Sequence, residues 1–155
     1  MATEASLSAA IIKGMFSSGH YAYKASDRFT IGVSDICGVS RDGRALAIET
    51  KLVPEWPARD DSRALKRPIT YQQLMFLDAI SSRGGFAWVA VGHPPVSGGR
   101  GICVQLFRVN QWRNLSLLSF SEGQNFIGEN VSAKYLKRGL GKVLEGNISK
   151  GLLWP

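Results

Sequence analysis

Hydrophobic residues recur at helical spacing in two parts of the chain. Leu7, Ile11 and Met15 stand at every fourth position, which predicts an amphipathic helix over residues 4–16. A second apolar stripe predicts another helix over residues 70–82, opened by a threonine N-cap and closed by a Gly-Gly pair. Each helix therefore has one face suited to packing against a sheet.

Shorter apolar runs, bounded by glycine, proline and polar residues, predict strands. An Asp-Gly pair between the second and third runs predicts a hairpin, and the nearly all-apolar fourth run predicts a central strand. The order helix, three strands, helix, two strands predicts a single α/β domain with a mixed central β-sheet flanked by helices. After residue 110 the pattern weakens, and only a basic helix over residues 132–144 is indicated. The predicted strands cover residues 20–25, 28–39, 45–52, 86–91 and 102–109.

The composition narrows the classes of protein that fit this chain. With 155 residues, 45% of them hydrophobic, it has the size and apolar content of one globular domain. A net charge of +7 and a pI near 9.7 favour binding to polyanions such as nucleic acids. The sequence contains no apolar run of membrane-spanning length and no signal-peptide pattern, so we expect a cytoplasmic protein. Cys37 and Cys103 form no CxxC pair, so we expect buried free thiols rather than a zinc site.

The candidate chemistry lies on the second and third predicted strands. Glu49 and Lys51 are two residues apart, so their side chains point to the same face of a strand. A carboxylate can hold a hard divalent cation, and a neighbouring lysine can steady a water nucleophile or the charge that develops in phosphodiester cleavage. Asp35 is a second candidate ligand, because a carboxylate within an apolar run is costly to bury unless it is paired or bound to metal.

The hairpin turn decides whether these two carboxylates can meet. A two-residue loop would place Asp35 opposite Thr50. A three-residue loop that ends in Gly43, with this glycine in the left-handed region, places Asp35 opposite Glu49 instead. Only the second register brings both carboxylates to one face, so the functional hypothesis predicts a bulged or odd-length turn.

Each of these residues also has a plain structural interpretation. Glu-x-Lys is a common pattern, and by itself Glu49-Thr50-Lys51 is more simply explained as an exposed ion pair on a strand. Asp35 is likewise explained as a charge at the end of a strand. His20 and His93 have no second histidine at ligand spacing, which favours structural roles for both.

Three segments, taken in order, resemble the VRR-NUC branch of the PD-(D/E)XK nuclease superfamily. The resemblance covers residues 24–91, less than half of the chain, and the three motifs together are more specific than Glu-x-Lys alone. It implies a restriction-endonuclease-like αβββαβ core over residues 1–110, with residues 111–155 as a C-terminal extension packed on the same domain. The matching segments are Gly32-Val33-Ser34-Asp35, Gly43 to Lys51, and Thr70 to Leu77 followed by Gly84 to Val89.

The resemblance also implies roles for individual residues. Asp35 and Glu49 correspond to the metal ligands, and the backbone carbonyl of Thr50 corresponds to the third ligand that the protein provides. Lys51 corresponds to the catalytic lysine. Gln73 corresponds to a glutamine that opens the next helix and points back to the site, whereas the adjacent Gln72 is expected to be a solvated helix residue. The implied cofactor is Mg²⁺ or Mn²⁺.

Other positions correspond less directly to the family pattern. Glu4 matches an acidic residue that some relatives carry near the metal, and equally fits a first-turn glutamate favoured by the helix dipole. Ser34 stands where relatives usually have proline, and serine can take the same extended conformation. Trp56 is either a base-stacking residue or part of the core. The basic residues expected to contact DNA phosphates are Lys24, Arg28, Arg59, Arg63, Lys66 and Arg67.

The resemblance implies a metal-dependent endodeoxyribonuclease that selects DNA structures, as Holliday-junction resolvases do. Such proteins are often encoded by phages, so the expected compartment is the cytoplasm of a bacterial or phage-infected cell. Symmetric cutting of two strands favours a homodimer. Three alternatives stay open: a non-catalytic DNA-binding module, a nuclease acting on other DNA or RNA substrates, and a structural or packaging protein. The last of these predicts that Asp35 and Glu49 lie on opposite faces.

Overall fold

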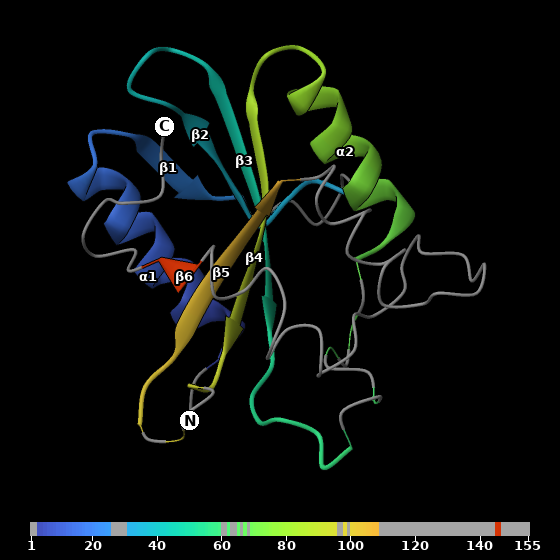
Figure 1. Cartoon of the computed structure of the whole chain (residues 1–155). Coiled ribbons are helices and arrows are strands. Elements are labelled where there is room, and N and C mark those ends of the chain that lie inside the picture. The colour runs from blue at the N-terminus through green and yellow to red at the C-terminus, as the bar shows by residue number, and fades with distance from the viewer. Residues whose placement is uncertain are drawn as a thin grey trace.

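Two helices lie on opposite sides of one mixed β-sheet in the computed structural model (Figure 1). The structure describes residues 3–25, 31–59, 62, 65, 67, 69–95, 98, 100–108 and 145–146. The elements are α1 (Glu4–Ser17), β1 (Tyr21–Lys24), β2 (Ile36–Val39), β3 (Ala45–Leu52), α2 (Tyr71–Ser81), β4 (Phe86–His93), β5 (Cys103–Arg108) and β6 (Glu145–Gly146). This order confirms the predicted single α/β domain, and it begins with the αβββαβ succession.

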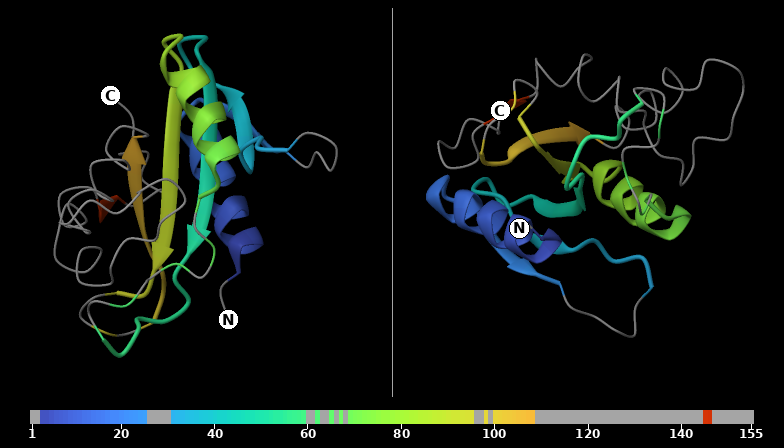
Figure 2. Two further views of the ribbon diagram at one scale, coloured as in Figure 1. Left: turned by 90° about the vertical axis from the view of Figure 1, so that its right-hand side faces the viewer. Right: turned by 90° about the horizontal axis from the view of Figure 1, so that it is seen from below.

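The sheet has the strand order β1-β2-β3-β4-β5-β6. Only β3 and β4 pair in parallel, and the helix α2 makes the crossover between them. All other neighbours are antiparallel. The strand β4 lies inside the sheet, as its apolar sequence predicted, and Figure 2 shows the sheet edge-on and from below.

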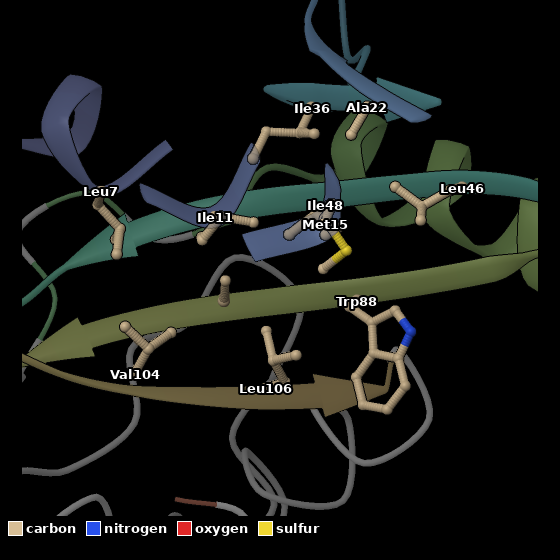
Figure 3. Close-up of a cluster of buried hydrophobic side chains, with 11 residues drawn as sticks. Leu7, Ile11, Met15, Ala22, Ile36, Leu46, Ile48, Trp88, Val104 and Leu106 are labelled. Carbon is tan, nitrogen blue, oxygen red and sulfur yellow. The ribbon is translucent and has the colours of Figure 1, made fainter. Parts of the chain in front are cut away.

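The helix α1 covers one face of the sheet. Thr3 and Ser6 close a capping box at its start, and its apolar stripe points inward. Leu7, Ile11 and Met15 are between 0 and 3% exposed, so each contributes roughly 1.5–3 kcal/mol through burial. We call this cluster the α1-face core, and Figure 3 shows how its side chains meet. Its members are Leu7, Ile11, Met15, Ala22, Ile36, Leu46, Ile48, Trp88, Ala90, Val104 and Leu106.

The helix α2 covers the other face of β3 and β4. The predicted capping box is present, with Thr70 as N-cap and Gln73 as its partner. We call the second cluster the α2-face core. Its members are Ala47, Val53, Leu65, Ile69, Leu74, Leu77, Ala87, Val89, Val91 and Phe107, with Trp56, Phe76 and Ile80 packed against it.

The hairpin between β2 and β3 has the three-residue turn that the functional hypothesis required. The backbone N–H of Ser40 donates to the carbonyl of Arg44 at 2.8 Å, and Gly43 has a φ of +85°. Ile36 pairs with Ile48, so the register leads Asp35 toward Glu49 rather than Thr50. A left-handed φ at the last turn residue is what makes glycine suitable here.

The second predicted strand is wrong in its length. Residues 31–35 are not strand, and β2 begins only at Ile36. Gly32 has a φ of +93°, a conformation that breaks an extended chain, and Ile31 is 85% exposed instead of facing a core. A Cβ on Gly32 would lie 2.6 Å from the Cβ of Gln72, so this segment passes tightly over the start of α2.

Other predictions have mixed outcomes. Cys37 and Cys103 are free thiols, as predicted, but they are only half-buried, so the prediction that they are buried was wrong. Of residues 111–155 the structure describes only the two residues of β6, which extend the sheet beside β5. The predicted helix over residues 132–144 lies outside the described residues. None of the helices described is long and apolar enough to span a membrane.

Candidate functional site

The strand β3 presents two different sets of side chains to its two faces. Ile48 belongs to the α1-face core, whereas Glu49 and Lys51 point to the face that α2 covers. Glu49 is 1% exposed and Lys51 is 7% exposed. The prediction that they share a face is confirmed, but they are a buried pair and not the exposed ion pair of the structural interpretation.

The carboxylate of Glu49 accepts two hydrogen bonds on the same oxygen. Lys51 Nζ donates to Oε1 at 2.8 Å, and Gln73 Nε2 donates to Oε1 at 2.5 Å. Glu49 and Lys51 therefore form a buried, charge-assisted pair that a neutral amide from α2 supports. The predicted inward orientation of Gln73 is confirmed.

The capping box determines which atom of Gln73 faces the site. Its Oε1 accepts the backbone N–H of Thr70 at 2.9 Å, while Thr70 Oγ1 accepts the backbone N–H of Gln73 at 3.2 Å. Because Oε1 is used at the helix end, Nε2 is the atom left to donate to Glu49. One residue thus caps α2 and orients the candidate carboxylate.

The second oxygen of Glu49 is the unusual atom of the site. Among the residues that the structure describes, Oε2 is buried and has no hydrogen-bond partner. Burial raises the pKa of Glu49 to about 7, the charge of Lys51 lowers it, and the charge of Asp35 raises it. The backbone N–H of Asp35 also favours the ionised form, although it does not satisfy Oε2. A bound cation would resolve both the unsatisfied oxygen and the cost of the negative charge.

Asp35 ends the pairing of β2 with β3. Its Oδ2 accepts the backbone N–H of Thr50 at 2.9 Å and the Thr50 hydroxyl at 2.6 Å. A carboxylate thus takes the N–H that a longer β2 would have bonded through its backbone. Asp35 lies at the edge of β3 beside Thr50, close enough to Glu49 for its charge to raise the pKa of that carboxyl.

The backbone of Thr50 supports its predicted role as a ligand. In a strand, the N–H and the C=O of one residue point to the same edge. Since the N–H of Thr50 points at Asp35, the carbonyl of Thr50 is turned to the same edge as that carboxylate. Asp35 and the carbonyl of Thr50 therefore lie at one edge of β3, next to Glu49 in the sequence of that strand, and the charge of Asp35 acts on the Glu49 carboxylate.

Sequence reasoning missed one polar residue behind the site. Ser8 is 2% exposed on the inner face of α1, and its hydroxyl lies 3.2 Å from the Thr50 hydroxyl and 2.9 Å from the Glu4 carbonyl. Thr50 donates its proton to Asp35, so the single proton of Ser8 goes either to the Thr50 hydroxyl or to the Glu4 carbonyl. A small polar residue within the apolar stripe of α1 was the available signal.

The donor set fits a hard divalent cation such as Mg²⁺ or Mn²⁺. Mg²⁺ is commonly held by one or two carboxylates, with waters and substrate oxygens completing its shell. The described residues contain no group of three His, Cys, Asp or Glu side chains able to hold a metal. Asp35 and Glu49 are the two carboxylates that would offer oxygens to such a cation, whereas Glu4 is exposed in the first turn of α1 and forms no such group with them among the described residues.

The remaining predicted residues lie around the site or elsewhere. Trp56 packs against the α2-face core beside His93, with ring centroids 5.1 Å apart, which favours the core interpretation. His20 is buried and accepts the backbone N–H of Arg41, and burial lowers its pKa, which agrees with a structural role. Among the predicted DNA contacts, Lys24, Arg59 and Arg67 are exposed, whereas Arg28, Arg63 and Lys66 lie outside the described residues.

Comparison with known proteins adds no relative. No protein-family model matches the sequence, and no curated protein matches it. The likeness to the VRR-NUC branch therefore stays a resemblance carried by the motifs, and the functional argument depends on the geometry of the site.

Proposed function

We propose that this protein is a metal-dependent nuclease that hydrolyses DNA phosphodiester bonds. One observation carries the proposal: Glu49 is buried with Lys51 and Gln73 on one oxygen and no partner among the described residues on the other. A purely structural ion pair has no need of an unsatisfied oxygen. The α2 face of β3 therefore supports cation binding better than it supports a stabilising role.

Each residue has a distinct part in the proposed reaction. Asp35, Glu49 and the carbonyl of Thr50 would hold Mg²⁺ or Mn²⁺, which when bound supplies Lewis-acid activation of the phosphodiester and of water. Lys51 is placed to stabilise negative charge on the attacking water or on the phosphoryl oxygens. Gln73 keeps the Glu49 carboxylate in one orientation, so that Oε2 faces away from the protein donors.

The nature of the substrate is supported by charge and by the motif resemblance. The net charge of +7 favours a polyanion, and the resemblance points to branched DNA cut by a homodimer in the cytoplasm of a bacterial or phage-infected cell. Cleavage of matched substrates separates branched DNA from the other nucleic acids.

The test is cleavage of a labelled four-way DNA junction beside matched duplex, single-stranded DNA and RNA, with Mg²⁺, Mn²⁺ or chelator. We expect metal-dependent cleavage that falls about 10²- to 10⁴-fold in Lys51→Ala. Lys13→Ala, an exposed lysine on α1, is the matched control and should cleave normally. Cutting of substrates other than the junction would keep the nuclease and discard the resolvase. Binding without cleavage of any substrate would favour a non-catalytic DNA-binding module.

A further inference from the structure

Two tyrosines on the edge strand β1 expose their rings to solvent. Tyr21 is 59% exposed and Tyr23 is 51% exposed, and their ring centroids lie 6.2 Å apart. Phe16 meets the ring of Tyr21 edge-on at 5.6 Å and helps to hold it in place. Adjacent exposed aromatic rings on a strand form an apolar surface that folding alone does not explain.

Tyr23 lies on the same face of the sheet as the candidate site, and Tyr21 lies beside it at the edge of the sheet, where its ring also meets Phe16 of α1. Ala22, between the two tyrosines, is buried in the α1-face core, so Tyr23 points to the opposite face. Through the register, Tyr23 pairs with Cys37, and Cys37 pairs with Ala47 of the α2-face core. The helix α2 packs on β3 and β4, away from β1 (Figure 1), so neither of the two described helices covers the rings on this part of the face.

The distance between the rings and the proposed metal ligands corresponds to the length of a few stacked nucleotides. Ala25, one pleat repeat after Tyr23, donates its backbone N–H to the carbonyl of Asp35 at 2.8 Å. Two strand spacings and one pleat repeat separate Tyr23 from Glu49, a path of about 12 Å. A stacked nucleic-acid strand advances about 3.4 Å per nucleotide, so this path corresponds to about four nucleotides.

We propose that Tyr21 and Tyr23 are a stacking surface for unpaired bases of the nucleic-acid strand that enters the site at Glu49 and Lys51. Tyrosine rings stack on any base, but only on bases whose faces are not covered by a duplex neighbour. This inference rests on the proposed nuclease function and adds a substrate feature to it, namely single-stranded nucleotides next to the bond that is cut.

Charge favours a nucleic acid as the occupant of the surface. The net charge of +7 attracts a polyanion. The surface also continues along the face that carries the proposed metal ligands.

The experiment measures binding of the full chain, in chelator, to a fluorescent 12-nucleotide single strand and to a blunt duplex of the same length. The variants are Tyr21→Leu and Tyr23→Leu, which keep apolar bulk but remove the ring, and Tyr21→Phe and Tyr23→Phe, which keep the ring. Met75→Ala, a 48% exposed apolar residue of α2, is the control. We expect each leucine variant to bind the single strand about 5- to 30-fold more weakly. The phenylalanine and Met75→Ala variants should bind like the wild type, and duplex affinity should change less than twofold.

Three results would overturn the proposal. Unchanged single-strand affinity in the leucine variants would exclude stacking, and an equal loss on the duplex would indicate a general contact. A change of oligomeric state in the leucine variants, measured by sedimentation, would assign the surface to a second copy of the chain. Because the assay needs no metal, its result is independent of cleavage: ring-dependent binding by a protein that cuts nothing would reject the nuclease and keep the stacking surface.

Discussion

The two faces of β3 carry opposite kinds of polar residue. On the α1 face, the hydroxyls of Ser8 and Thr50 are buried and bonded to each other, to a backbone carbonyl and to Asp35. On the α2 face, Glu49 is equally buried, yet its Oε2 has no partner within the described part of the chain. Thr50 and Glu49, neighbours on one strand, therefore differ in whether the fold provides hydrogen-bond partners for their buried polar atoms.

This difference distinguishes polar groups that stabilise the fold from polar groups that are suited to bind a ligand. A satisfied buried polar group adds to the uniqueness of the fold, whereas an unsatisfied buried carboxylate costs stability unless a ligand compensates for it. The polar groups on the α1 face are therefore explained by folding alone. On the α2 face, the free-energy cost of burying the Glu49 carboxylate would be offset by cation binding. Changes on the two faces should accordingly have different consequences.

The largest effect is expected for Glu49→Gln on the α2 face. The amide oxygen can still accept from Lys51 and Gln73, but the charge that would hold the metal is lost. Metal-dependent cleavage should fall at least about 1000-fold, equivalent to about 4 kcal/mol in the transition state. Glu55→Gln is the matched control, since Glu55 is exposed in the loop after β3. Steady-state cleavage that is equal in both variants would remove Glu49 from the site.

A change on the α1 face should show the converse behaviour. Ile11 is fully buried, and Ile11→Ala should lower the free energy of unfolding by about 3–5 kcal/mol through lost burial and a cavity. Denaturant titration measures this loss. Cleavage per folded molecule should stay within about twofold of the wild type, and a much larger loss at full folding would mean that the two faces are not separable.

The pKa of Glu49 predicts how stability changes with pH. The folded state keeps the proton up to about pH 7, whereas the ordinary value of 4.5 applies once the chain unfolds. In chelator, the free energy of unfolding should therefore fall by up to about 3 kcal/mol as the pH rises through this window. Mg²⁺, which binds the ionised carboxylate, should remove much of that fall. Denaturant unfolding at several pH values measures it, and an unchanged slope in Glu49→Gln would show that another group titrates.

The smallest effect is expected on the α1 face, at the Thr50 hydroxyl that contacts Asp35. Thr50→Val removes one of the two hydrogen bonds to Asp35 Oδ2 and keeps the backbone one. We expect Mn²⁺ affinity, measured by calorimetry, to fall about 10-fold, because the ligand is less firmly oriented. Ser8→Ala should weaken affinity less, since Thr50 can still donate to Asp35. If Ser8→Ala lowers Mn²⁺ affinity more than Thr50→Val does, Thr50 is not the residue that mainly orients Asp35.

Several features of the site could be predicted from the sequence. The shared face of Glu49 and Lys51 follows from the period of a strand, and the three-residue turn follows from Gly43. The orientation of Gln73 was indicated by the resemblance and by its place in a capping box. The extent of β2 could not be predicted, because Gly32 breaks the strand where it passes over Gln72, a residue 40 positions away.

The sequence by itself determined the order of the elements and the two apolar helix faces, because these depend on neighbours within a few residues, and it reduced the register of the β2–β3 hairpin to two alternatives. Only the tertiary structure decided that Glu49 is buried with one oxygen unsatisfied, that Asp35 bonds to Thr50, and that Tyr23 of β1 shares the face of the site. These features depend on desolvation and on contacts between distant segments, for which the local pattern carries no signal.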